Sequence, residues 1–129
     1  MKIEHLGIWV NDLEAMRKFY MKYFGMKSGE KYTNDKNGFS SYFLSFGGVK
    51  TRLELMHKTT IVNIDTPRGN NMGIAHFAIS MADKAQVNNL TERLRADNYV
   101  IASEPRTSGD GYYESVILDP EGNFVEIVF

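Results

Sequence analysis

The chain has 129 residues, a formal net charge of −1 from 15 basic and 16 acidic side chains, and no cysteine. Its 43% hydrophobic and 24% charged content is typical of one globular domain, not of a disordered chain or a coiled coil. No run approaches the ~20 apolar residues of a membrane span, no secretory signal is visible, and the near-neutral charge gives no case for nucleic acid or anionic lipid. Without cysteine, disulfides, thiolate nucleophiles and cysteine-ligated metals are excluded, and we predict a cytoplasmic location.

An internal repeat is the main feature of the sequence. His5 opens an apolar run that leads to an aspartate and a helical pattern, and His76 opens the same series in the second half. A second correspondence joins Glu54 to Glu126, each within a short apolar segment. The two spacings differ by only one residue, which indicates two modules of nearly equal length.

The repeat predicts a single domain over residues 1–129. We place its two repeats at about 1–57 and 73–129. A linker over 58–72, rich in glycine, proline and asparagine, joins them.

The first repeat begins with a strand predicted over residues 2–10. Asp12 caps the following helix through its side-chain oxygen, and Gly25 ends it in a left-handed conformation. That helix carries apolar residues at helical spacing: Leu13, Met16, Tyr20 and Tyr23. Two strands over 41–46 and 51–56 follow, joined at a pair of glycines.

The second repeat has the same order of elements. A strand is predicted over 74–80, and Asp83 with Gln86 resembles a capping box at the start of a helix. The helix has an apolar stripe and then a polar end: Val87, Leu90 and Leu94, followed by Asp97 and Asn98. Strands over 112–118 and 124–129 are joined by a proline- and glycine-containing turn. Each repeat is therefore expected to be a βαβββ module.

Strand alternation predicts which side chains share a face. His5 and Trp9 are expected on one face of the first strand, and Glu4 on the other. Glu54 and its counterpart in the second repeat are expected mid-strand, as are the two histidines. An isolated carboxylate in an apolar stretch is costly unless it is paired or bound to a metal.

Taken singly, a strand histidine is more often a hydrogen-bonded core residue, and a strand glutamate usually faces water. The repeat changes this balance, because His5, Glu54, His76 and Glu126 occupy equivalent places in two modules. Two imidazoles and two carboxylates suit zinc, nickel or cobalt, with manganese and iron as further possibilities. Four protein ligands in an octahedral sphere leave two open positions, the mark of a catalytic metal.

These residues give the chain a resemblance to the vicinal oxygen chelate superfamily, and within it to the glyoxalase I-like branch. The matching segments cover nearly the whole chain: residues 5–8, 12–13, 19–26, 53–55, 73–78 and 119–126. The resemblance implies an α+β fold in which two βαβββ modules form a cupped, barrel-like mixed sheet around one divalent metal ion.

The resemblance also implies a function. It points to a metal-dependent lyase or isomerase, similar to lactoylglutathione lyase, that acts on the hemithioacetal of a 2-oxoaldehyde and a thiol through a metal-bound enediolate. By position Glu126 would move the proton, with Glu54 opposite it. Enzymes of this length in the branch usually work as homodimers, in which His5 and Glu54 of one chain would meet His76 and Glu126 of the other.

The sequence departs from the glutathione-using enzymes at three positions that help to hold glutathione. Trp9 stands where those enzymes commonly have arginine, Lys58 where they have asparagine, and a stretch from Ser108 where they have lysine. The thiol is therefore left open. Other cations could supply the charge, although each is more often a surface residue: Arg17, Arg52, Lys58 and Arg68.

Two aromatic residues are candidates for the wall of a substrate pocket, namely Trp9, on the His5 face, and Tyr113, beside a glycine-rich loop. Two alternatives to the lyase stay open. One is a non-catalytic small-molecule binder of the bleomycin-resistance type, although such proteins typically lack the metal ligands. The other is an epimerase-like enzyme, against which Glu54 counts because that branch usually has glutamine there.

Overall fold

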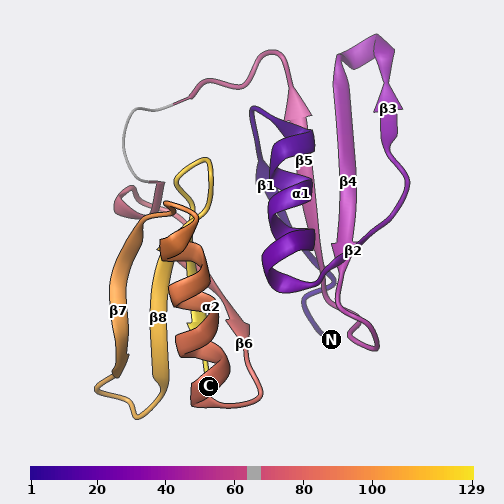
Figure 1. Ribbon diagram of the computed structural model, residues 1–129. Coiled ribbons are helices and arrows are strands. Elements are labelled where there is room, and N and C mark those ends of the chain that lie inside the picture. The colour runs from indigo at the N-terminus through magenta and orange to yellow at the C-terminus, as the bar shows by residue number, and fades with distance from the viewer. Residues whose placement is uncertain (64–67) are drawn as a thin grey trace. The chain divides into compact units, whose positions relative to one another are not determined.

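The computed structural model describes residues 1–63 and 68–129, and the chain divides into two compact units, Met1–Asn63 and Ile64–Phe129. We refer to them as the N-terminal and C-terminal units. In each, an α-helix lies across one face of a β-sheet (Figure 1). Pro67, in the predicted linker, lies outside the described residues. No helix in the described part of the chain is long and apolar enough to cross a membrane.

The N-terminal unit has one sheet with strand order β1-β5-β4-β2, and β3 pairs with β4. Its elements in chain order are β1 (His5–Trp9), α1 (Leu13–Phe24), β2 (Lys27–Ser28), β3 (Tyr32–Asn34), the 3-10 helix η1 (Asp35–Asn37), β4 (Phe39–Ser45) and β5 (Arg52–Lys58). The first and last strands, β1 and β5, are parallel neighbours, while β4 runs antiparallel to β5.

Helix α1 begins and ends where the sequence predicts. The Asp12 side chain accepts a hydrogen bond from the Ala15 backbone N–H at 2.9 Å, a cap typically worth about 1 kcal/mol. Gly25 ends the helix with φ +66°, a conformation that glycine adopts without a Cβ clash. The helix buries one side: Leu13, Met16, Phe19, Tyr20, Tyr23 and Phe24. Strand β5 buries Leu53 and Leu55, which leaves the alternate β5 residues on the sheet's other face.

The C-terminal unit repeats this plan with strand order β6-β9-β8-β7. Its elements are η2 (Arg68–Asn70), β6 (His76–Ser80), α2 (Lys84–Ala96), β7 (Ile101–Thr107), β8 (Tyr113–Leu118) and β9 (Phe124–Val128). Again the first and last strands of the module, β6 and β9, are parallel neighbours. The predicted pair of βαβββ modules is therefore confirmed.

Helix α2 is capped by Asp83, which accepts from the Gln86 backbone N–H at 2.8 Å. The Gln86 side chain accepts in return from the N–H of Ala82, one residue before the position of a standard capping box. On the buried side of the helix, the Thr91 hydroxyl lies 2.7 Å from Ser115 Oγ of β8. Leu90, predicted for the apolar stripe, is only half-buried, and the fully buried Thr91 joins Val87 and Leu94 in its place.

The predicted boundaries differ from the structure mainly at strand ends. β1 begins at His5 and β6 at His76, later than predicted, because the residues before them run outside the ladders. β5 continues to Lys58, the first residue of the predicted linker. The sequence predicts no bounds for strand β7, because its residues are mostly polar and include a proline, and β-bulges interrupt its pairing with β8.

Candidate metal centre

The parallel pairing of β1 and β5 brings His5 and Glu54 together. In the register Gly7 lies opposite Glu54, so His5, two residues earlier, lies on the same face and one diagonal step away. His5 Nε2 and Glu54 Oε2 are 3.6 Å apart. A histidine and a carboxylate far apart in the sequence are thus adjacent because of strand register alone.

The C-terminal unit reproduces this arrangement. Ala78 lies opposite Glu126 in the parallel β6–β9 pair, and His76 again stands two residues before that partner. His76 Nε2 lies 3.3 Å from Glu126 Oε1. The structure therefore arranges the four predicted ligands as two equivalent histidine–glutamate pairs, one within each unit.

The four side chains differ in exposure in the same way in both units. The carboxylates are the more buried members, with 14% of the Glu54 side chain and 19% of the Glu126 side chain exposed. The imidazoles of His5 and His76 are 41% and 47% exposed. The expectation that the histidines stand mid-strand is wrong, because each is the first residue of its strand, where the sheet edge leaves the ring open.

Two further charged side chains, Glu4 and Arg52, lie beside the His5–Glu54 pair. The Glu4 carboxylate oxygen Oε2 lies 2.5 Å from His5 Nδ1, and Arg52 Nε donates to Glu4 Oε1 at 2.9 Å. The hydrogen bonds with His5 first, and then with Arg52, hold the pKa of Glu4 below its ordinary value. The prediction that Glu4 faces away from His5 is wrong, because Glu4 precedes β1 and strand alternation does not govern it.

The sequence does not predict that Glu4 contacts His5. Two features of the sequence point to this contact: Glu4 stands directly before a candidate ligand, and Arg52 stands two residues before Glu54. Alternation hides these features, since it assigns neighbouring residues to opposite faces. The Phe43 ring, on β4, also packs perpendicular to the His5 ring, with 5.4 Å between ring centroids.

The donor set fits a divalent metal ion. When the neutral His5 ring donates its Nδ1–H to Glu4, its Nε2 is an acceptor that faces the Glu54 carboxylate, itself an acceptor. A proton or a metal cation between them removes that repulsion. Imidazole nitrogen and carboxylate oxygen are ligands for zinc, nickel and cobalt. Within residues 1–63 and 68–129, no cluster of three or more histidine, aspartate or glutamate side chains forms a complete metal site.

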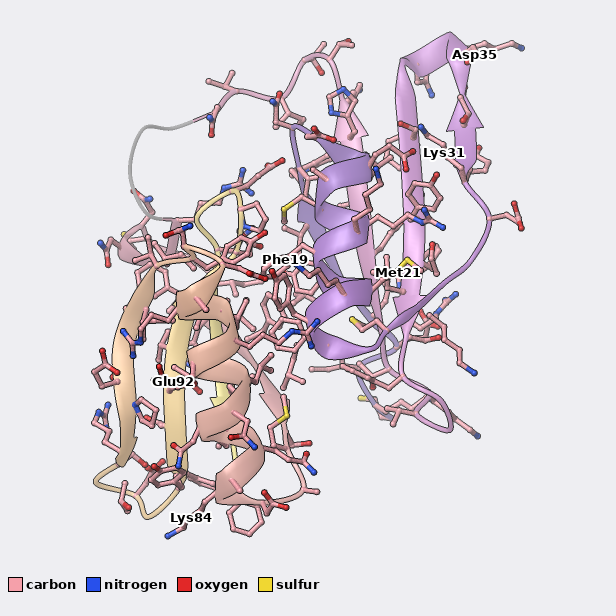
Figure 2. The ribbon with its side chains drawn as sticks, in the orientation of Figure 1. Phe19, Met21, Lys31, Asp35, Lys84 and Glu92 are labelled. Atoms are coloured by element: carbon pink, nitrogen blue, oxygen red, sulfur yellow. The ribbon has the colours of Figure 1, made fainter. Side chains whose placement is uncertain are left out.

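The two predicted pocket residues lie in different settings. Trp9 shares the His5 face of β1 and meets Phe39 edge-on, at 6.2 Å between ring centroids. Tyr113 alternates with Glu114 on β8, and its hydroxyl donates to Asn88 of α2 at 2.8 Å. Lys84, in the first turn of α2 (Figure 2), lies over the Tyr113 ring at 5.1 Å. Tyr113 thus faces the helix, and the structure does not bring it to the side of the sheet that carries Glu126.

Three of the four cations considered as replacement anchors pair with carboxylates. Arg17 lies 3.9 Å from Glu14, Arg52 contacts Glu4, and Arg68 lies 3.2 Å from Glu121. Lys58, at the end of β5, alternates onto the same face as Glu54. At the third departure from the glutathione-using pattern, the Ser108 hydroxyl donates to Asp110 within the β7–β8 turn.

Comparisons with known proteins identify the family and the fold. Residues 2–127 match the family described as the Glyoxalase/Bleomycin resistance protein/Dioxygenase superfamily. An uncharacterized Bacillus subtilis protein, YqjT, is 28% identical over 98% of this chain and 97% of its own length. The solved structure of glyoxalase I from Zea mays is 27% identical with a TM-score of 0.80, covering 98% of this chain and 44% of that chain.

A further solved structure, a glyoxylase/bleomycin resistance protein/dioxygenase domain from Frankia sp. EAN1pec, has a TM-score of 0.83 at 15% identity. It covers 100% of this chain and 97% of that chain, and it shows the shared fold alone. The family match spans nearly every residue and the fold agrees with it. The chain therefore belongs to the Glyoxalase/Bleomycin resistance protein/Dioxygenase superfamily, also called the vicinal oxygen chelate superfamily.

Proposed function

We propose that the protein is a metal-dependent glyoxalase I-like enzyme that isomerises the hemithioacetal of a 2-oxoaldehyde and a thiol. The observation that carries this proposal is the equivalence of the two histidine–glutamate pairs, at 3.6 and 3.3 Å, in two halves of the chain. One metal ion bound by both pairs would account for this recurrence, because neither pair alone supplies the donors of a complete site.

The proposed ligands are His5, Glu54, His76 and Glu126. Each pair alone offers two donors, fewer than the three protein ligands of typical catalytic zinc sites. One metal held by both pairs gives four ligands and leaves positions for substrate oxygens. When bound, a divalent ion such as zinc, nickel or cobalt supplies Lewis-acid stabilisation of negative charge on neighbouring oxygens.

Glu126 is proposed as the residue that moves the proton. Its carboxylate takes the proton from the carbon that bears the hydroxyl and sulfur, and delivers it to the adjacent carbonyl carbon. The hydroxyl proton passes to the former carbonyl oxygen, so that the first carbon becomes the thioester carbonyl and a 2-hydroxy thioester forms. Partial exposure supports this role, because 19% of the Glu126 side chain is open, so a substrate can reach the carboxylate while little water competes for it. Glu54, in the equivalent place, faces the other side of the substrate.

The thiol is proposed to differ from glutathione. Trp9 supports this, because an aromatic ring stands at a position where the glutathione-using enzymes commonly hold a carboxylate with arginine. The engagement of Arg17, Arg52 and Arg68 with carboxylates supports it too, since each would have to leave a partner to bind a substrate anion. Lys58 is the remaining candidate for a substrate carboxylate.

A second candidate function is small-molecule binding without turnover. It is favoured by the aromatic residues around Trp9, since Phe39 meets both Trp9 and Tyr32, the latter at 6.0 Å between ring centroids. Such rings stack well on planar ligands. A binder of this kind would hold its ligand stoichiometrically and would need no metal.

We also propose a homodimer in which each site combines pairs from two chains, and this can be tested by mixing two inactive variants. His5→Ala and His76→Ala should each lose metal binding and turnover. In a mixed dimer with shared sites, one site would regain both intact pairs. Recovery of metal binding on mixing supports the shared site, while no recovery in a mixed dimer places both pairs of a site in one chain.

The direct test of the function combines metal loading and turnover in one sample. The protein is loaded with zinc, nickel or cobalt, the metal is confirmed by elemental analysis, and methylglyoxal hemithioacetals of glutathione and of other small thiols are assayed. Turnover of a non-glutathione hemithioacetal with bound metal supports the whole proposal. Bound metal with no turnover of any thiol adduct contradicts the lyase, and ligand binding without metal favours the second candidate.

A further inference from the structure

The His5 ring is held on several sides by residues of its own unit. Glu4 Oε2 lies 2.5 Å from Nδ1, the Phe43 ring packs perpendicular to the His5 ring, and Nε2 points to Glu54. The ring of a neutral histidine carries one proton, and a hydrogen bond at one nitrogen decides which nitrogen keeps a lone pair. A carboxylate at Nδ1 places the proton there and leaves Nε2 as the metal-binding atom.

Arg52 in turn fixes Glu4. Its side chain donates twice to Glu4 Oε1, from Nε at 2.9 Å and from Nη2, and its backbone N–H donates to the Glu4 carbonyl at 3.0 Å. The guanidinium also stacks over Phe43, 4.0 Å from the ring centroid. The Thr51 hydroxyl donates to the carbonyl of Ile3, which holds the same segment to β5. Glu4 is exposed and outside β1, yet its position is set by several contacts.

Within residues 68–129, the positions of the C-terminal unit that correspond to Glu4 and Arg52 carry different side chains. Ala75 precedes His76 as Glu4 precedes His5, and Phe124 lies opposite His76 as Arg52 lies opposite His5. Neither Ala75 nor Phe124 offers a side-chain acceptor to an imidazole. The contrast shows that the histidine–glutamate approach forms without Glu4 and Arg52, so these two residues do something additional for His5.

We propose that Glu4, anchored by Arg52, is a positioning residue that fixes the tautomer and orientation of His5 as a metal ligand. This rests on the metal-binding function proposed above. A carboxylate behind a histidine ligand orients the ring and raises its basicity, and loss of such a partner typically weakens metal binding by about 10- to 100-fold. The His5 half of the site is then held ready before metal arrives.

The test uses the full chain with Glu4→Ala, which removes the carboxylate, and Glu4→Gln, whose amide oxygen can still accept from Nδ1–H. Glu92→Ala is the matched control. Glu92 is an exposed glutamate of the C-terminal unit, and it pairs with Arg95 of the same helix. The first readout is ¹⁵N NMR of the neutral imidazoles in metal-free protein, because the two ring nitrogens differ according to which one carries the proton. The second is zinc affinity measured by competition with a chelator.

The chain has three histidines, and the other two serve as internal references. His57 Nδ1 lies 2.9 Å from the Val10 carbonyl, so its signal reports a ring protonated at Nδ1. In the wild-type protein His5 should give the same tautomer as His57. Glu4→Ala should shift His5 toward the tautomer protonated at Nε2 and leave His76 unchanged. In Glu4→Gln the His5 tautomer should be intermediate between those of the wild type and Glu4→Ala.

Zinc affinity should fall by about tenfold in Glu4→Ala and change by less than about twofold in Glu92→Ala. An unchanged His5 tautomer, or an unchanged zinc affinity in Glu4→Ala, overturns the positioning role. If wild-type protein binds no zinc, the proposed function fails, and the NMR readout still decides whether Glu4 sets the His5 tautomer.

Discussion

The two units share a backbone plan and differ in how they surround it. In both, a parallel strand pair sets a histidine one diagonal step from a glutamate, with the two groups 3.6 Å apart in one unit and 3.3 Å in the other. His5 is held by an ionic network, through Glu4 and Arg52. His76 instead follows a segment that packs on its own unit, where Gly69 lies against Ala75 and the Phe124 ring.

Packing beside the two glutamates differs as well. In the N-terminal unit, Gly7 lies opposite Glu54, and Met56 follows Glu54 on the same face of β5. In the C-terminal unit, Ala78 and Val128 occupy the equivalent positions. The first position is therefore larger, and the second smaller, than in the N-terminal unit. Register thus fixes the approach of the two ligands, while the residues around them are free to differ.

The largest expected effect separates the two carboxylates. Glu126→Gln should lower turnover by at least about 100-fold and leave the fold unchanged, because an amide cannot accept the substrate proton. Glu54→Gln, the equivalent change in the other unit, should weaken metal binding and spare more of the turnover measured at saturating metal. Steady-state kinetics with circular dichroism as the folding control measures both. If Glu126→Gln kept substantial turnover and Glu54→Gln lost it, the roles assigned to the two glutamates would be reversed.

The next largest effect falls on the segment before His76. A Cβ at residue 69 would lie 2.3 Å from the Ala75 carbonyl oxygen and 2.6 Å from Phe124. Because a backbone oxygen cannot swing away, Gly69→Ala should cost about 2–3 kcal/mol of stability. Gly29→Ala is the control in the other unit, since its Cβ would make only an ordinary 3.6 Å contact. Chemical denaturation compares the two, and equal stability would show that the segment is not packed as described.

A smaller effect tests the exchanged volumes beside Glu54. A Cβ on residue 7 would lie 2.8 Å from the Met56 Cε, the flexible end of a side chain. Gly7→Ala should therefore cost less than about 1 kcal/mol, and adding Met56→Val should recover part of it by recreating the Ala78–Val128 combination. Denaturation of the two single variants and the double variant gives the coupling. Strictly additive losses would contradict the compensation.

The smallest effect lies on the helix side of the N-terminal unit, on the sheet face opposite the His5–Glu54 pair. The Tyr42 hydroxyl donates to the Glu14 carboxylate at 2.9 Å. The Lys31 ammonium (Figure 2) lies 3.1 Å from the same carboxylate. The hydrogen bond from Tyr42 first, and then that from Lys31, hold the pKa of Glu14 below its ordinary 4.5. A lowered folded-state pKa means that this stabilisation is present above pH 4.5 and is lost as pH falls through the folded value.

Glu14→Gln should therefore destabilise the protein near neutral pH by less than about 1 kcal/mol, since the carboxylate is half-exposed. The difference from wild type should shrink as the pH approaches about 3. Thermal unfolding across that range measures it, with Glu30→Gln, an exposed carboxylate on the same unit, as the control. A difference that grows in acid would contradict the sign of the shift.

The sequence predicts much of this architecture because it repeats. His5 and His76, read together with Glu54 and Glu126, predict equivalent strand pairs, and the aspartate caps at residues 12 and 83 predict both helix starts. Glu4 could not be predicted, because its role depends on where β1 begins, and hydrogen bonding rather than side-chain pattern decides a strand end. The face on which Tyr113 lies could not be predicted for a related reason, since only the register of β8 shows that it faces α2.

The central claim is that the two histidine–glutamate pairs hold one metal ion. Its most direct test is metal binding to the metal-free protein, with stoichiometry from elemental analysis and affinity from chelator competition, in wild type, His5→Ala and His76→Ala. The claim predicts one zinc, nickel or cobalt ion per chain in the wild type, and a large loss of affinity in both variants. Wild-type affinity in either variant, or no metal bound by the wild type at any loading, would contradict it.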